Sequence, residues 1–267
     1  MIPAPRPVPS HGRIDSDPSG AASCASSPIA EVSERMADEE FVSRSLRRCA
    51  LFAHVEPEGL SVLARAMVTR RFRRNEVIFH QGDPGDALFI MASGSVKVVL
   101  PSDEGAEPAI VAILGPGEFF GELAILDGAP HSATIVALEP TETLVLHRDA
   151  FLALIDEQPE LRRALLASLA TEIRRLTGHV EDLHFLDLPG RLSSRILRLT
   201  VDCEPDPDGS IRIAWPYTQS ELAGMIGGSR QSVNRLLADL TDEGLVRMER
   251  DVLVVTDRDK LARTVER

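Results

Sequence analysis

The sequence predicts an α+β protein with three ordered parts: an N-terminal β jelly roll, a long central helix and a C-terminal winged helix-turn-helix domain. Three observations support this prediction. Short apolar or alternating runs, separated by turn signals, fill residues 68–146. Apolar residues then recur at helical spacing. A helix, a glycine turn, a second helix and two short apolar runs follow. The length of 267 residues suits about two domains.

Residues 40–158 are predicted to form the jelly-roll domain. The runs EVIFH, ALFIMAS, SVKVVL, AIVAIL, SATIVAL and TETLVLH are strand-like, and GDPGD, SGS, GPGE and LDGAP lie between them as turns. Short helices are expected before the strands, between residues 41 and 66. Residues 1–39 are rich in Pro, Ser and Gly and poor in large apolar side chains, so a disordered tail is expected there.

Residues 159–188 are predicted to form the central helix. Pro159 lies near its start, where a helix tolerates proline. Apolar side chains then follow an a/d heptad spacing with charged residues beside them, which favours a two-stranded coiled coil and therefore a homodimer. The alternative is that a single helix packs this stripe on the β domain. The seam consists of Leu166, Leu169, Ile173, Leu176, Val180 and Leu183.

Residues 189–267 are predicted to form the winged helix-turn-helix domain, in which the second helix of the motif faces DNA. Ser229 is placed to cap that helix. Arginine suits guanine and Gln or Asn suits adenine in the major groove, whereas hydroxyls at helix starts suit phosphates. The alternative is an ordinary solvated helix face. The expected DNA-contacting residues are Thr218, Ser229, Arg230, Gln231, Asn234 and Arg235.

The charge distribution agrees with a local DNA contact. The formal net charge is −12, which argues against a surface coated by a polyanion. Residues 191–267 carry 12 basic and 13 acidic residues, against 17 and 28 in the rest of the chain. The acidity therefore lies mainly outside the predicted DNA-binding domain.

Cysteine spacing and hydropathy exclude several other classes of protein. The three cysteines form no CxxC pair, which argues against a disulfide scaffold, a zinc finger or a four-cysteine iron–sulfur site, and no metal site is expected. No apolar run approaches the ~18 residues of a membrane span, and residues 1–30 lack the apolar stretch of a signal peptide. A cytoplasmic protein without a membrane partner is expected.

The segments HQGDPGDALFIMASGSVKVVL and GPGEFFGELAILDGAPHSATIVAL resemble a cyclic-nucleotide-binding domain. Together with the central helix and the winged helix-turn-helix, residues 41–256 resemble the cyclic-AMP receptor protein / FNR family of bacterial transcription regulators. The resemblance implies a homodimer on a two-fold symmetric DNA site, contact with RNA polymerase, and an effector that repositions the DNA-binding domains through the central helix.

The resemblance also implies a phosphate-binding cassette, which in the family reads G-E-L-A-x-x-x-x-x-P-R-[SAT]-A. Backbone amides at a short helix start hold the phosphate, the glutamate binds the ribose 2′-hydroxyl, and the arginine neutralises the phosphate. Here His131 occupies the arginine position, and by alignment the adenine-contacting pair of the central helix becomes Leu176 and Thr177. The expected ligand-binding residues are Gly121, Glu122, Leu123, Ala124, His131, Ser132, Leu176 and Thr177.

No cofactor is certain, but cyclic AMP or cyclic GMP is a possible effector, weakened by His131. A neutral imidazole supplies one donor and no charge, so losing the arginine contact costs on the order of 1.5–3 kcal/mol. Three interpretations of His131 stay open: it binds a cyclic nucleotide weakly, it lines a pocket for another effector, or it is inert. In the recognition helix, Gln231 replaces the family's glutamate, which predicts an altered half-site.

The leading hypothesis is therefore a homodimeric, effector-responsive DNA-binding transcription regulator. A ligand-independent DNA-binding regulator with a degenerate pocket is the first alternative, and a cyclic-nucleotide-binding regulatory module of an enzyme is the second. The chain itself is not expected to be an enzyme. Ser132 beside His131, or Glu122 near either, is not a nucleophile–base arrangement, because adjacent residues in a strand point to opposite faces.

Overall fold

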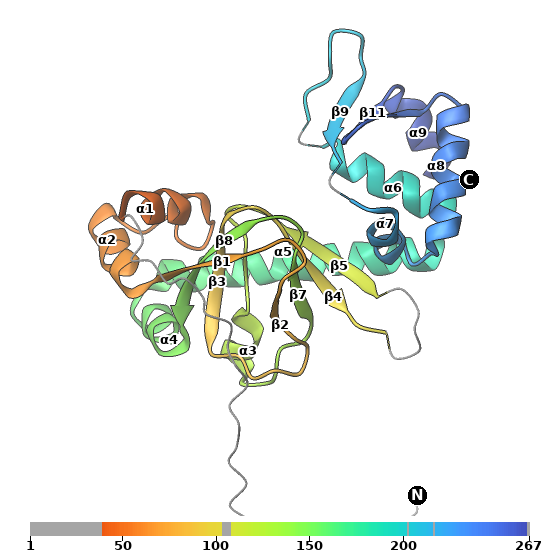
Figure 1. Ribbon diagram of the computed structural model, residues 1–267. Helices are drawn as coiled ribbons and strands as arrows, with labels where there is room; N and C mark the ends of the chain where they lie inside the picture. The colour runs from red at the N-terminus through yellow and green to blue at the C-terminus, as the bar shows by residue number, and fades with distance from the viewer. Residues whose placement is uncertain (1–38, 103–107, 202, 216, 266–267) are drawn as a thin grey trace, which may run out of the picture. The chain divides into compact units, whose positions relative to one another are not determined.

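The computed structural model describes residues 39–102, 108–201, 203–215 and 217–265. Almost all of the predicted N-terminal tail, residues 1–39, lies outside this range. The first described part contains helices α1–α4 and strands β1–β8 (Figure 1). In chain order these are α1 Glu39–Arg48, α2 Pro57–Ala66, β1 Val68–Phe72, β2 Val77–Phe79, β3 Ala87–Ser93, β4 Val96–Leu100, β5 Ala109–Leu114, β6 Phe119–Phe120, α3 Glu122–Asp127, β7 Thr134–Ala137, β8 Thr141–His147 and α4 Arg148–Glu157. Helices α1 and α2 precede the strands, α3 lies between β6 and β7, and α4 follows β8.

The strands form two antiparallel sheets, in the orders β1-β8-β3-β6 and β2-β7-β4-β5. Every run predicted to be a strand is one. The prediction missed β1, whose sequence VTRRF is mostly polar, and the two-residue β6. Phe89, Met91 and Ile135 belong to the apolar cluster between the sheets, whereas α1, α2 and α4 pack on a second cluster around Leu88 and Ile90.

The central helix α5 runs from Pro159 to Phe185. Leu161 and Leu165 are buried against the jelly-roll core and Leu169 is partly buried there. The predicted end at residue 188 is wrong by three residues. Leu186 is extended and Asp187 caps the next helix, because its side chain accepts a hydrogen bond of 2.9 Å from the Gly190 amide.

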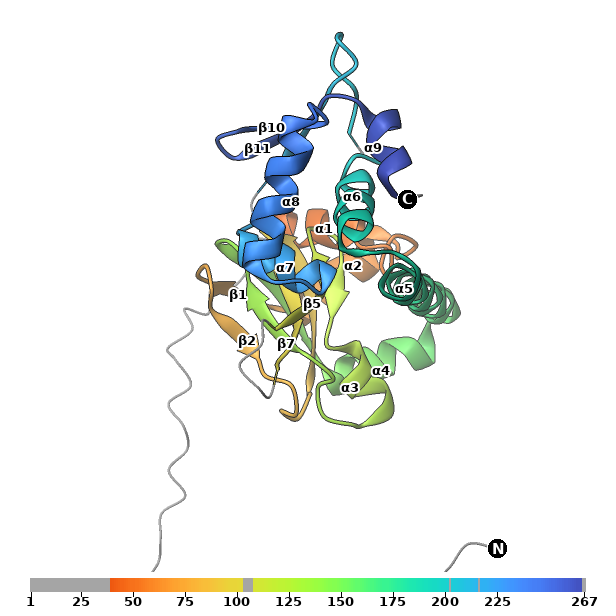
Figure 2. The same cartoon turned by 90° about the vertical axis from the view of Figure 1, so that its right-hand side faces the viewer.

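The C-terminal domain contains helix α6, the helix-turn-helix pair α7 and α8, a three-stranded wing and a last helix, α9. Its elements are α6 Leu188–Leu199, β9 Ile211–Ala214, α7 Gln219–Ile226, α8 Arg230–Asp242, β10 Val246–Glu249, β11 Val252–Val255 and α9 Arg258–Val265. Figure 2 shows α7 and α8 crossing, with the β10–β11 hairpin beside α8. The sheet order is β10-β11-β9. Helix α9 was not predicted, because its sequence RDKLARTV is largely polar and Leu261 is its one buried residue.

This domain packs on the edge of the jelly roll. Val99 of β4 and Ile110 of β5 belong to the same apolar cluster as Leu222 and Ile226 of α7. The Lys97 ammonium lies 2.7 Å from the Glu221 carboxylate. Within the described residues, no helix is long and apolar enough to cross a membrane and no cluster of three or more His, Cys, Asp or Glu suits a metal ion.

Candidate DNA interface and effector site

The first helix of the motif begins and ends with local hydrogen bonds. The Thr218 hydroxyl accepts from the Glu221 amide at 3.2 Å, and the Glu221 carboxylate accepts from the Thr218 amide at 2.8 Å, which is a capping box. At the other end Gly227 has a φ of 67°, a conformation that only glycine adopts without cost. The chain therefore turns sharply after α7 into the second helix.

The second helix, α8, starts at Ser229, whose hydroxyl accepts from the Ser232 amide at 3.1 Å. The predicted apolar wedge between α7 and α8 is present: most of its members are buried and one is partly buried. These residues are Leu222, Ala223, Ile226, Val233, Leu236 and the partly buried Leu237. The wedge fixes α8 against α7, so the opposite face of α8 points outward.

The outward face of α8 carries the four predicted base-reading side chains. Arg230, Gln231, Asn234 and Arg235 are all exposed, and the first turn of α8 contains no acidic residue. Thr218 is exposed as well, at the start of α7. Two guanidinium groups and two amides on one exposed helix face have the hydrogen-bonding groups that major-groove edges require.

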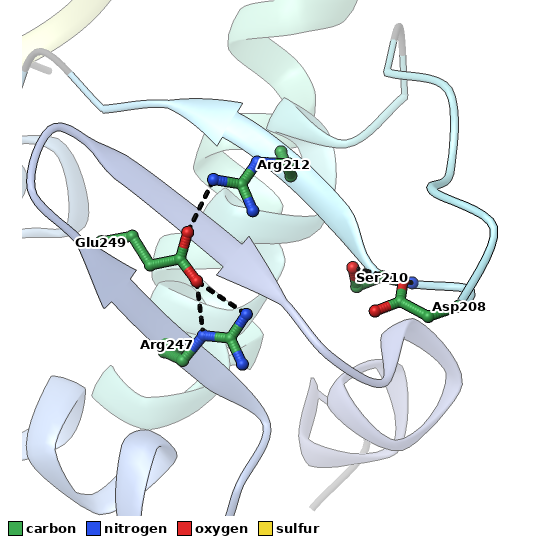
Figure 3. A network of polar contacts seen from close by, with 5 residues as sticks. All are labelled: Asp208, Ser210, Arg212, Arg247 and Glu249. Carbon is green, nitrogen blue, oxygen red and sulfur yellow. Dashed lines mark hydrogen bonds and ion pairs between the residues drawn. The ribbon is translucent and has the colours of Figure 1, made fainter.

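A charged network crosses the wing (Figure 3). Glu249 of β10 accepts hydrogen bonds from Arg212 of β9 at 2.6 Å and from Arg247 of its own strand at 2.8 Å, and the bond to Arg212 spans the intervening strand β11. The bond from Arg212 is the main reason that the pKa of Glu249 is lowered. Beside it, hydrogen bonds from Ser210 lower the pKa of Asp208. Such exposed pairs add little stability.

The cassette residues of the jelly roll surround helix α3. Gly121 has a φ of 91° and precedes α3, and a Cβ at this position would lie 2.7 Å from the Ala87 carbonyl oxygen. Glycine is therefore required there. Ala124 is buried, Leu123 is 46% exposed, and Glu122 opens the helix. The Arg148 guanidinium donates to the Ala124 carbonyl at 3.3 Å and so links the start of α4 to α3.

His131 is buried and fixed on both its backbone and its ring. Its amide donates to the Asp83 carbonyl at 2.8 Å, and its ring stacks on Phe79 with centroids 3.5 Å apart. Burial lowers the pKa of His131, while Asp83 and Asp86 act in the opposite direction. The imidazole is therefore neutral near pH 7.

The strand argument about Ser132 and His131 is wrong in its premise, because both residues precede β7 and lie in a loop. Ser132 is nevertheless exposed while His131 is buried. The two side chains therefore differ in exposure, but not for the reason given by the strand argument.

Sequence reasoning missed Glu172 as a neighbour of the cassette. Burial raises the pKa of Glu122 to about 7, and the charge of Glu172 on α5 adds to this rise. Glu172 also pairs with Arg175. The two α5 residues predicted to face the ligand, Leu176 and Thr177, are exposed in the single chain, and the Thr177 hydroxyl donates to the Ile173 carbonyl. The sequence did offer a signal for this contact: Glu172 lies one helical turn before Leu176, which was predicted to face the ligand, so both residues are on the same side of α5.

Two family descriptions match this chain, one in the jelly roll and one in the C-terminal domain. Residues 69–158 match "Cyclic nucleotide-binding domain" and residues 190–264 match "Crp-like helix-turn-helix domain". The CRP-like cAMP-activated global transcriptional regulator of Mycobacterium tuberculosis is 34% identical over 218 residues, which cover 82% of this chain and 97% of that protein. The chain belongs to the CRP/FNR family of bacterial transcription regulators.

Other relatives agree with this assignment. The cyclic AMP receptor protein of Thermus thermophilus is 34% identical to this CRP/FNR-family protein over 198 residues, covering 74% of this chain and 88% of the relative. A solved CRP-family transcriptional regulator of T. thermophilus superposes with a TM-score of 0.62 at 26% identity, covering 74% and 96% of the two chains. The protein is thus a DNA-binding transcription regulator with a cyclic-nucleotide-binding domain, and its family is not enzymatic.

Proposed function

We propose that this regulator is a homodimer that binds a two-fold symmetric DNA site and that a cyclic nucleotide in the jelly roll changes its affinity for DNA. One observation carries the proposal: a single chain combines a cassette around α3, an exposed base-reading face on α8, and a 27-residue helix between them. RNA polymerase is the proposed partner at promoters, from the family resemblance, and the cytoplasm is the proposed location.

The apolar stripe of α5 supports the homodimer. Beyond the first turns, which pack on the jelly roll, the chain leaves the stripe uncovered: Leu166, Ile173 and Val180 are 65%, 64% and 63% exposed. Leu176 and Leu183 continue the stripe with 40% and 44% exposure. A second copy of α5 would bury these side chains at the spacing of a coiled coil, and would place two α8 helices for two half-sites one helical turn apart.

Cyclic AMP is the proposed effector because relatives with 34% identity are named for it and because the backbone of the cassette is kept. Gly121 has the required left-handed conformation and Glu122 stands at the start of α3. The charge is not kept, since a neutral His131 replaces a permanent cation. We therefore propose weak binding that strengthens when His131 is protonated.

Calorimetric titration of cyclic AMP into the full-length protein at pH 6 and pH 8 tests the effector. Micromolar binding that is tighter at pH 6 is the expected result. Equal affinity at the two pH values would remove the role of imidazolium, and no heat at millimolar ligand would favour the ligand-independent alternative.

DNA recognition is tested separately, by selecting bound sequences from a random duplex pool. The best-known members of the family read a TGTGA-type half-site with a glutamate at the position of Gln231. A two-fold symmetric consensus that departs from TGTGA at one base pair is expected here, because glutamine both donates and accepts where glutamate only accepts. An unchanged TGTGA consensus would refute the altered half-site, and an asymmetric consensus would refute the two-fold operator.

A further inference from the structure

A cavity of about 430 Å³ is lined mainly by residues of β5, α5, α6 and α7. None of the cassette residues lines it. Four of the lining residues are arginines from two helices: Arg175 of α5, and Arg191, Arg195 and Arg198 of α6. Backbone and apolar groups of Ile110–Ile113, Met225 and Ile226 form much of the rest. The cavity therefore gathers four cationic side chains and one acidic side chain, Asp182, in a partly apolar surrounding.

Two of the four arginines are neutralised within the chain. Arg175 pairs with Glu172 at 2.5 Å and also donates to the Val111 carbonyl at 2.6 Å. Arg198 pairs with Asp182 at 2.5 Å. These pairs hold the outer guanidinium groups in place and leave their charge compensated.

Arg191 and Arg195 have no acidic partner among the described residues. Arg191 donates one hydrogen bond, of 2.7 Å, to the Ile226 carbonyl. The Nε atoms of both arginines are buried and have no hydrogen-bond partner in the described part of the chain. Burial lowers the pKa of Arg195, Tyr217 acts in the opposite direction, and the charges of Arg198 and Arg175 lower the pKa further. Buried donors on uncompensated cations are costly, so native proteins normally satisfy them.

We propose that this cavity is an anion-binding site for a small molecule that carries phosphate or a similar oxyanion group, held by Arg195 and Arg191. The guanidinium fork matches such oxyanions in a bidentate manner. A DNA duplex is far too large for a cavity of about 430 Å³. The site goes beyond the proposed function, because it is separate from both the cassette and the exposed face of α8.

The position of the site gives its ligand a regulatory consequence. Its walls come from the jelly roll (β5) and from the DNA-binding domain (α6 and α7), which also meet at the Lys97–Glu221 pair. At Gly224 the two parts are so close that a Cβ would lie 2.5 Å from the Pro108 carbonyl oxygen. A ligand that needs both walls binds only the docked arrangement and stabilises it by mass action.

Isothermal calorimetry of inorganic pyrophosphate against the full-length protein tests the site. Wild type is expected to bind, and Arg195→Gln to bind about ten- to a hundredfold more weakly or not at all, because a charge-assisted contact is lost. The matched control Arg263→Gln removes the same charge from an exposed position on α9 and is expected to bind like wild type. Arg195→Lys keeps the charge without the fork and is expected to fall between wild type and Arg195→Gln.

Several results would overturn the site. They are the absence of heat with wild type at millimolar pyrophosphate, an equal loss in Arg263→Gln, or a loss in His131→Ala, which would place the anion in the cassette. Circular dichroism checks that each variant is folded. If Arg195→Gln does not fold, the pyrophosphate affinity of Arg195→Lys decides whether Arg195 holds the anion. Failure of pyrophosphate binding would leave DNA selection and cyclic AMP titration unaffected, so the two proposals fail independently.

Discussion

The recognition helix α8 and the cassette helix α3 arrange their charges in opposite ways. Helix α8 begins with Arg230 and carries Arg235 about one and a half turns later, both exposed, with no acid in its first turn. Helix α3 begins with Glu122, whose pKa burial raises to about 7, and faces a neutral His131 in place of a cation. The proposed DNA-reading chemistry therefore lies on exposed side chains, whereas the proposed effector chemistry lies on groups whose pKa values are shifted by burial and by their neighbours.

The largest expected effect comes from disrupting the apolar stripe of α5, the helix that connects the two regions. Ile173→Asp places a carboxylate in the exposed apolar stripe and is expected to give a monomer. DNA affinity should then fall by about a hundredfold or more, because two linked recognition helices gain avidity over one. Light scattering and fluorescence anisotropy with the selected duplex measure the two effects.

Thr171→Asp is the matched control for this variant. Thr171 is exposed on the same helix but lies outside the stripe, so the control is expected to stay dimeric and bind DNA normally. A dimer that survives Ile173→Asp would show that another surface joins the subunits.

Arg235→Ala tests the exposed half of the comparison. A bidentate contact to a base is worth about 1–3 kcal/mol, and a dimer uses it twice, so DNA affinity is expected to fall about thirtyfold or more. Specificity at one base pair of each half-site should relax as well. Arg263→Ala removes the same charge from α9 and is expected to leave DNA affinity nearly unchanged. Equal losses in the two variants would mean that general charge, rather than base contact, binds DNA.

His131→Arg tests the buried half. A guanidinium restores a permanent charge and stays planar, so it stacks on Phe79 as the imidazole does. Cyclic AMP affinity is expected to rise about ten- to a hundredfold and to lose its dependence on pH. Calorimetry at pH 6 and pH 8 measures both changes. Unchanged affinity would indicate that the pocket serves another effector.

Glu122→Gln probes the cost of the buried carboxyl in the ligand-free protein. The folded pKa of about 7 lies above the ordinary value of 4.5, so the folded state binds the extra proton between these values. The associated stability is present at low pH and is lost as the pH rises through 7. Glutamine removes this loss, so the variant is expected to be about 1–3 kcal/mol more stable than wild type at pH 8.

The difference should close as the pH falls from 7 toward 4.5. Urea unfolding followed by circular dichroism measures it, and Glu181→Gln on the exposed face of α5 is the control. A difference that persists at pH 5 would mean that packing, rather than ionisation, is responsible.

The two regions also differed in how far the sequence could predict them. The α7–α8 turn, the Ser229 cap and the outward face of α8 depend on residues within a few positions of one another, so local rules predicted them. The burial of His131 against Phe79 and the influence of Glu172 on Glu122 join residues about fifty positions apart, and only the folded chain brings them together. The arginine-lined cavity is the same kind of feature, because Arg175 and Arg195 lie on different helices.

Ser229→Ala gives the smallest expected effect and shows how much of the recognition helix is local. The Ser229 hydroxyl accepts from the Ser232 amide, and losing such a cap costs about 1 kcal/mol of stability. DNA affinity should fall by a further modest factor, because the hydroxyl at a helix start is also a predicted phosphate contact. Ser220→Ala removes a hydroxyl from within α7 and leaves both caps intact, so it is expected to change neither quantity. If Ser229→Ala lowers stability but not DNA affinity, Ser229 only caps α8, and the exposed arginines and amides carry the DNA contact without it.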